Sequence, residues 1–109
     1  MKYFGNAFSL GMLGMLKGNA TLSVELAAQS RVSEQIPSCV SCIGHADLAA
    51  QLSSLLGVEV KHARVNVELV QGDTLFVAQY KGPRLPEGTT VLPAGASFVF
   101  FEVNVAVQS

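Results

Sequence analysis

Charged residues are scarce in this chain. Only 14% of its 109 residues are Asp, Glu, Lys or Arg, whereas 50% are hydrophobic. A small monomer usually covers more of its surface with charge, so we expect part of the apolar surface to be buried between copies of the chain. The formal net charge of -1 argues against a general nucleic-acid coat protein. The length suits a single domain spanning residues 1–109.

The chain also lacks a long hydrophobic run. The apolar segment 3–16 is interrupted by Asn6 and three glycines, and no small-residue cleavage site follows it. The segment is too short for a membrane span, which takes about 20 apolar residues. We therefore expect neither a signal peptide nor a transmembrane helix, and we expect a cytoplasmic protein.

The two cysteines, Cys39 and Cys42, form a single CxxC pair, and no second pair exists. Structural zinc usually needs four ligands. If residues 37–43 form a strand, the two thiols point to opposite faces, roughly 10 Å apart at about 3.3 Å per residue. That geometry suits neither a shared metal nor a disulfide, so we expect buried small hydrophobic residues. A metal site that also recruits His45 is the alternative.

The hydrophobic pattern predicts an α+β fold: a mixed, mostly antiparallel sheet of about five or six strands with one or two flanking helices. Strands are expected at residues 1–6, 20–26, 37–43, 62–70, 74–80 and 97–107. The turn at residues 71–73 predicts a hairpin between the fourth and fifth of these strands.

Two helices are expected. The first runs over residues 10–17, with Ser9 as its N-cap and Gly18 at its end. The second starts at about Ala46 and stops at Gly57, because residues 48, 52 and 55 place leucines on one apolar stripe. The pattern of residues 27–35 fits either a short helix or an irregular connection.

Asn6 and Ser9 lie in "GNAFSLGML", where a predicted strand leads into a predicted helix. Backbone N–H groups at a helix start form a ready site for an anion. The alternative is that Ser9 only caps the helix and Asn6 only occupies a turn.

His45 follows Gly44 in "IGHADL", at the positive end of the second helix. Gly44 allows close approach of the backbone. An anion bound there would favour the protonated imidazole, which could then act as a general acid. The alternative is a surface histidine without a role.

The segment "YKGPRLPEG" opens the longest predicted loop, residues 81–95, and carries Lys81, Arg84 and Glu87. Long loops inside compact chains are often functional, and an arginine fork suits a phosphate group. The alternative is a solvated, charged loop. The sequence has no nucleophile elbow, no carboxylate cluster for two metals and no glycine-rich phosphate loop.

Four stretches carry a resemblance: "GNAFSLGML", "CIGHADLAAQLSSLLGVEV", "RVNVEL" and "GPRLPEG". In this order they resemble the viral and bacterial ring nucleases of the type III anti-CRISPR kind. The resemblance implies a homodimer with a ligand pocket at the subunit interface. It also implies binding and metal-independent cleavage of cyclic tetra-adenylate, the messenger that type III CRISPR systems make on detecting foreign RNA, with no cofactor.

The resemblance assigns roles to individual residues. The catalytic set it implies is His45, Arg84 and Glu87. The ligand-binding set it implies is Asn6, Ala7, Phe8, Ser9, Gly44, Arg64 and Gln79. Some members carry hydroxyl side chains just after the histidine, where this chain has Ala46, Asp47 and Leu48. The charge of Asp47 is unfavourable near a phosphate unless the side chain points away.

The implied reaction is phosphodiester cleavage by a neighbouring 2′-hydroxyl, inside a bacterial or archaeal cell. Two-fold symmetry would give two cuts in the ring and a linear di-adenylate with a 2′,3′-cyclic phosphate. The alternative functions are a binding protein that sequesters the cyclic nucleotide without cutting it, a general ribonuclease, and a structural dimer without a ligand.

Overall fold

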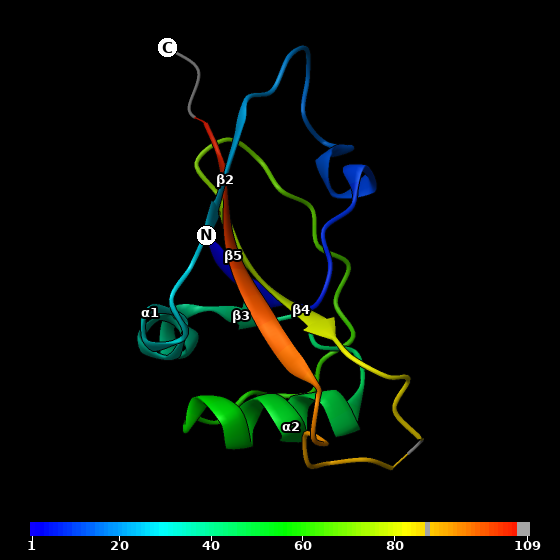
Figure 1. The fold of residues 1–109 in the computed structure, drawn as a ribbon. Helices are drawn as coiled ribbons and strands as arrows, with labels where there is room; N and C mark the ends of the chain where they lie inside the picture. Colours follow the sequence, from blue (N-terminus) through cyan, green and yellow to red (C-terminus); the bar gives the residue numbers. More distant parts are fainter. Residues whose placement is uncertain (87, 107–109) are drawn as a thin grey trace.

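The computed structural model describes residues 1–86 and 88–106 (Figure 1). In chain order the elements are β1 (Lys2–Gly5), the 3-10 helix η1 (Leu10–Leu13), β2 (Leu22–Leu26), α1 (Gln29–Gln35), the 3-10 helix η2 (Ile36–Ser38), β3 (Val40–Ser41), α2 (Ala46–Leu56), β4 (Thr74–Lys81) and β5 (Ser97–Val105). None of the helices in the described part of the chain is long and apolar enough to cross a membrane.

The five strands form one mixed sheet in the order β2-β5-β4-β1-β3. The long pairs β2–β5 and β4–β5 are antiparallel. The pairs β1–β4 and β1–β3 are parallel, with Phe4 between Phe76 on one side and Ser41 on the other. The predicted α+β class and mixed sheet are therefore confirmed. Because β1 and β3 are parallel neighbours, the residues that follow them emerge at the same edge of the sheet.

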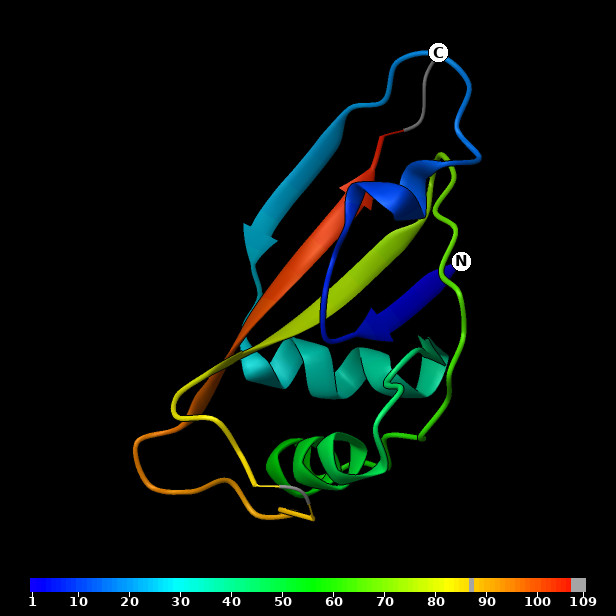
Figure 2. The same cartoon turned by 90° about the vertical axis from the view of Figure 1, so that its right-hand side faces the viewer.

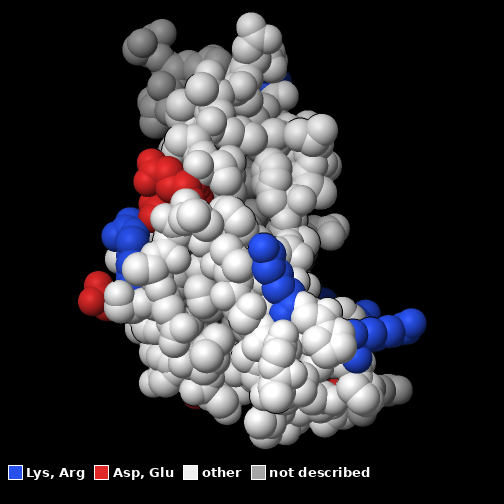
Figure 3. Space-filling view, viewed as in Figure 1, with Lys and Arg blue, Asp and Glu red and all other residues white. Residues whose placement is uncertain are grey.

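One face of the sheet is only partly covered. The segment around η1 and residues 67–69 pack over β4 and the adjacent strands. No element of the described chain covers the part of this face near β2, which is turned toward the viewer in Figure 2. Val24 and Leu26 of β2 are 61% and 74% exposed. Large parts of the surface in Figure 3 carry no charged side chain, as the composition requires.

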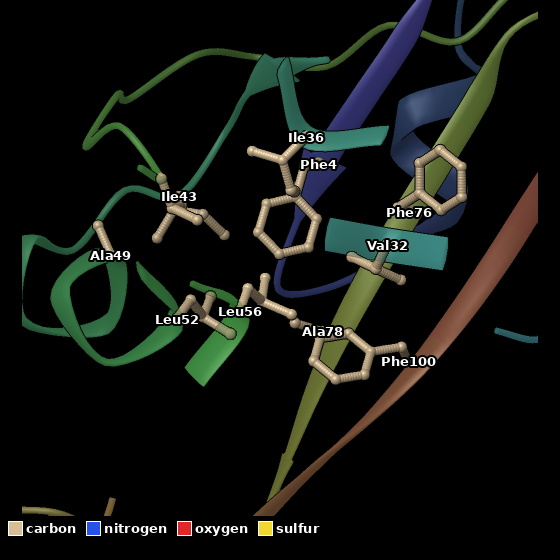
Figure 4. Packing of buried hydrophobic residues seen from close by; sticks show 11 residues of the cluster. Phe4, Val32, Ile36, Ile43, Ala49, Leu52, Leu56, Phe76, Ala78 and Phe100 are labelled. Atoms are coloured by element: carbon tan, nitrogen blue, oxygen red, sulfur yellow. The ribbon is translucent and has the colours of Figure 1, made fainter. Parts of the chain in front are cut away.

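Helices α1 and α2 cover the other face and enclose the main core (Figure 4). Leu52 of α2 and Val32 of α1 are fully buried, and they pack in one cluster with Phe4, Phe76 and Phe100 of the sheet. This core fixes α2 against the sheet. The N-terminal end of α2 is thereby held beside the edge where β1 and β3 end.

The prediction for α2 is confirmed at both ends. The helix starts at Ala46 with His45 as its N-cap, and Gly57 ends it with a φ of 70°. Glycine adopts this left-handed conformation without the steric cost of a side chain. The undecided segment 27–35 contains α1.

The predicted helix over residues 10–17 is wrong in length and type. The chain forms only the short 3-10 helix η1, and the Ser9 side chain makes no capping bond. Gly11 and Gly14 lower the helix propensity by about 1 kcal/mol each relative to alanine. The strand predicted at 20–26 begins only at Leu22.

The predicted hairpin of residues 62–70 with residues 74–80 is wrong. Among the described residues, β4 pairs with β1 and β5, and the segment before it forms only one bridge, from His62 to Ile43. The backbone N–H of Leu69 donates instead to the carbonyl oxygen of Met12, at 2.7 Å. The alternating residues Val67 and Leu69 pack on the face of the sheet rather than extending it.

The predicted strand over residues 37–43 is also too long. Pro37 lies in the first turn of η2, and the strand is reduced to Val40–Ser41. Cys39 and Cys42 are both free and partly buried, and burial raises the pKa of each thiol. Within residues 1–86 and 88–106, no group of three or more His, Cys, Asp or Glu residues could hold a metal ion.

Leu52→Ala should destabilise the fold by about 2–5 kcal/mol, because it removes a fully buried side chain and leaves a cavity between α2 and the sheet. Urea unfolding measures this change. Ser54→Ala, at an exposed position of the same helix, is the matched control. A loss below about 1 kcal/mol for Leu52→Ala would contradict the packing described for α2.

An ion pair joins α1 to β5. Arg31 Nε donates to Glu102 Oε1 at 2.7 Å, and Arg31 Nη2 donates to Glu102 Oε2 at 3.2 Å. The hydrogen bond from Arg31 is the main reason why the pKa of Glu102 is lowered. Such a carboxylate stabilises the fold above the pKa it has in the unfolded chain, about 4.3, and this contribution is lost as the pH falls through the lowered pKa.

Glu102→Gln should therefore reduce the acid sensitivity of the fold. Between pH 7 and about pH 3, the Tm of the wild type should fall further than that of Glu102→Gln, because only the wild type loses a favourable carboxylate. Thermal unfolding followed by circular dichroism at the two pH values tests this. Equal decreases in Tm would show that the pair does not contribute.

Candidate functional site

A hollow of about 460 Å³ at the N-terminal end of α2 brings together four of the predicted residues. They are Asn6, Gly44, His45 and Arg64. Cys42, Val65 and Asn66 complete the lining. We call this the His45 hollow. Its residues come from three separate segments. Asn6 and residues 42–45 meet because β1 and β3 are parallel neighbours and end at the same edge, and the bridge from His62 to Ile43 brings residues 64–66 beside them.

Gly44 is the backbone anchor of the hollow. Its carbonyl oxygen lies 3.2 Å from Arg64 Nε, which donates to it, and 3.2 Å from His62 Nε2. Ile43, just before it, is buried and bridges to His62. The Arg64 side chain is therefore held at the hollow by one hydrogen bond, from its Nε–H to the Gly44 carbonyl oxygen. Its terminal amino groups have no hydrogen-bond partner among the described residues, so the guanidinium remains available to an anion.

His45 is the N-cap of α2. Its backbone is extended, with φ −125° and ψ 126°, and its carbonyl oxygen accepts the first helical bond, from Ala49 N at 3.0 Å. The imidazole makes no capping bond, and it is exposed. The first N–H groups of a helix without a side-chain cap are left to water or a ligand, and the helix dipole favours a negative charge there.

A second hollow of about 350 Å³ adjoins the first. The two share the lining residues Asn6, Cys42, Val65 and Asn66. Ala7 and Ser9, predicted to bind ligand, lie in this second hollow together with Glu68. The two hollows are therefore neighbours: the first is lined by the basic side chain of Arg64 and the second by the carboxylate of Glu68.

Cys42 lies in both hollows, yet it is a poor nucleophile. Burial raises the pKa of its thiol, so the group stays protonated near neutral pH. Asn66 is a lining residue that sequence reasoning missed, because it lies inside the segment 62–70 that the sequence predicts as a strand. Its place between two alternating valines gave no signal of a pocket.

Phe8 and Gln79 lie elsewhere. Both line a shallow apolar depression on the partly covered face of the sheet, with Val24, Val77, Phe101 and Val103. The side chain of Gln79 donates only to the neighbouring carbonyl oxygen of Tyr80, at 3.3 Å. The structure does not bring these two predicted residues into the His45 hollow.

The loop between β4 and β5 carries Arg84, which is exposed and lines neither hollow. The prediction for Glu87 lies outside the described residues. The loop nevertheless docks on α2: the backbone N–H of Gly88 donates to Asp47 Oδ2 at 2.8 Å. Figures 1 and 2 both show the loop beside the N-terminal end of this helix.

Comparison with known proteins identifies the family. The model of the STIV B116-like family matches residues 2–94. The chain belongs to the STIV B116-like family. A solved structure of B116 of Sulfolobus turreted icosahedral virus superposes on this B116-like chain with a TM-score of 0.76, covering 94% of this chain and 97% of that one. This superposition shows a shared fold, and the two sequences are 22% identical. No curated protein sequence matches the chain.

Proposed function

We propose that this B116-like protein is a metal-independent ring nuclease that binds cyclic tetra-adenylate and cleaves it to linear di-adenylate with a 2′,3′-cyclic phosphate. In a bacterial or archaeal cell this phosphodiesterase activity would switch off type III CRISPR signalling. The observation that carries the proposal is the meeting of Asn6, Gly44, His45 and Arg64 in one hollow.

The charges in the His45 hollow suit a phosphodiester. Arg64 supplies a guanidinium that is fixed by the Gly44 carbonyl oxygen. The uncapped start of α2 supplies backbone N–H groups and the positive end of the helix dipole. His45 supplies an imidazole that no described residue engages. A bound phosphate in this position favours protonation of the imidazole.

Cleavage then needs no further nucleophile than the ligand itself. The 2′-oxygen of one nucleotide, whose hydroxyl proton passes to solvent, forms a bond to the adjacent phosphorus, and the bond from phosphorus to the 5′-oxygen breaks. Protonated His45 gives its proton to the leaving 5′-oxygen, a transfer typically worth about 10²–10⁴ in rate. Freezing the ring with the leaving oxygen in line supplies much of the remaining acceleration.

Arg84 would stabilise the charge that develops on the phosphorane, at about 10²–10³ in rate by analogy with oxyanion-hole donors. In the resemblance Glu87 either holds Arg84 or orients the 2′-hydroxyl. Because Arg84 lies outside the hollow, the segment of the loop before Gly88 would move over the bound ring, while the contact of Gly88 with Asp47 keeps the rest of the loop beside α2.

The proposed active form is a homodimer. Val24 and Leu26 expose apolar surface on the sheet face that this chain leaves uncovered. Phe8 and Gln79 lie on or beside the same apolar face, so a partner chain would complete their environment. A four-fold ring placed across a two-fold axis presents an equivalent phosphodiester to each subunit.

The decisive experiment incubates the purified protein with cyclic tetra-adenylate in EDTA and follows the products by chromatography and mass spectrometry. We expect di-adenylate 2′,3′-cyclic phosphate to form through a once-cut linear intermediate. Inhibition by EDTA that zinc or magnesium reverses would overturn the metal-independent reaction. A ring that is bound tightly but stays intact would make the protein a sequestering binder.

His45→Ala should lower the cleavage rate by about 10²–10⁴ while ring affinity changes much less, because the substitution removes the proton donor and leaves Arg64 in place. Single-turnover kinetics and calorimetric titration separate the two effects. The fold should be intact, since the imidazole is exposed and caps nothing. Unchanged turnover would remove His45 from the reaction.

Arg84→Ala should weaken both ring binding and the cleavage rate, the rate by about 10²–10³. Lys17→Ala removes the same charge from an exposed site far along the sequence and is the matched control. If both variants reduce the rate equally, general attraction of an anion explains the effect. If Arg84→Ala cleaves like the wild type, Arg84 has no part in the site.

A further inference from the structure

Two side chains of α2 hold the loop that carries Arg84. Asp47 Oδ2 accepts a hydrogen bond from the backbone N–H of Gly88 at 2.8 Å. Gln51 Nε2 donates to the carbonyl oxygen of Thr89 at 2.5 Å. We call these two contacts the loop clamp. Asp47 and Gln51 are one helical turn apart, so they present an acceptor and a donor side by side to two consecutive residues of the loop.

The loop is shaped to meet this pair. The N–H and hydroxyl of Thr89 both donate to the carbonyl oxygen of Pro86, at 3.2 and 2.7 Å. Gly88 has a φ of 86°, a conformation that side-chain-bearing residues rarely adopt. The local turn therefore uses the donors of Thr89 internally, and it leaves the N–H of Gly88 and the carbonyl of Thr89 for the helix.

The base of the loop is held separately. The β4–β5 ladder runs to the pair Lys81–Ser97. Just beyond it, a Cβ on Gly82 would lie only 2.8 Å from the Cα of Ala96, so the two backbone segments at the base of the loop are in close contact. The hydroxyl of Tyr80 donates to the carbonyl oxygen of Pro83 at 2.5 Å. In the sequence, Arg84 thus lies between residues 80–83, which are held at the base of the loop, and residues 88 and 89, which are held by the loop clamp.

We propose that Asp47 is a positioning residue: through Gly88 it ties the Arg84 loop to the helix that begins at His45. This inference rests on the proposed function, because it gives Arg84 and His45 a joint task. Asp47 follows His45 by two residues, yet it does not line the His45 hollow. Its carboxylate bonds to the loop at Gly88 and is not part of the lining that would meet a phosphate.

Within the clamp, Asp47 is the stronger contact. A hydrogen bond to a carboxylate is roughly twice as strong as one between neutral groups. Gln51 is 3% exposed, and its Oε1 atom has no hydrogen-bond partner among the described residues. A buried acceptor without a partner is unfavourable, which offsets part of the bond that Gln51 makes to Thr89. Loss of Asp47 should therefore release the loop more than loss of Gln51.

Backbone hydrogen exchange tests the clamp without any ligand. In the wild type the amide of Gly88 should be protected, and in Asp47→Ala it should exchange about 10-fold faster or more. Asp47→Asn retains an acceptor oxygen and should keep most of the protection. Both variants lose the charge in the first helical turn, so their difference reports the hydrogen bond alone. Ser54→Ala on the same helix is the control with unchanged exchange.

Kinetics test the link to Arg84. Asp47→Ala should lower kcat on cyclic tetra-adenylate by about 10- to 100-fold, as expected for a misplaced catalytic group, whereas Asp47→Asn should stay within about 3-fold of the wild type. In the Asp47→Ala background, adding Arg84→Ala should lower kcat by less than about 3-fold more, because the arginine is already displaced. Full additivity of the two losses would overturn the positioning role.

The outcomes are distinguishable from failure of the proposed function. If the wild type does not cleave the ring, the proposed function fails and the positioning role fails with it, while the exchange rates still decide whether the clamp exists. If the wild type cleaves and Gly88 exchanges equally in Asp47→Ala and wild type, the clamp is wrong and the nuclease stands. Equal loss of kcat in Asp47→Asn and Asp47→Ala would assign the effect to charge rather than to loop position.

Discussion

The parallel pairing of β1 with β3 is the constraint on which the candidate site depends. With Tyr3 opposite Val40 and Phe4 opposite Ser41, the two strands end at one edge. The chain leaves β1 at Asn6, and it passes from β3 through Gly44 to the N-terminus of α2 at His45. An antiparallel arrangement of the same strands would place these residues at opposite ends of the sheet. In open α/β sheets, ligands commonly bind outside the carboxyl ends of parallel strands, which is the corresponding position here.

The core keeps this edge in place. Leu52 and Leu56 of α2 pack with Phe4 and Ala78 of the sheet in one cluster, so the helix cannot shift without opening buried surface. The proposed general acid therefore sits on a rigid element, whereas Arg84 sits on a loop. A site divided in this way needs a link between the two parts. The contact of Asp47 with Gly88 supplies one, at 2.8 Å.

Features set by local sequence were predictable. The leucine stripe and Gly57 defined α2, and Gly44 before a helix start led to His45 as a candidate. Features set by distant pairing were not. The alternation of Val65, Val67 and Leu69 is equally compatible with a strand and with a segment lying on a sheet face. The hydrogen bond from Leu69 N to Met12 O joins residues far apart in the chain, and it holds this segment on the face of the sheet rather than in it.

The same limit applies within the site. Asn66 and the partners of the loop, Asp47 and Gln51, acquire their roles only from the folded arrangement, since nothing adjacent in sequence marks them. Phe8 and Gln79 show the converse: the resemblance assigned them to the ligand, and the fold places them on the partly covered face of the sheet. Their assignment now depends on what that face meets in the proposed homodimer.

The most direct measurement of the central claim is a crystal structure of His45→Ala with cyclic tetra-adenylate bound. The account predicts a phosphodiester group of the ring in the His45 hollow, within hydrogen-bond reach of the Arg64 guanidinium and the first backbone N–H groups of α2. A ring bound elsewhere, with this hollow left to solvent, would contradict it.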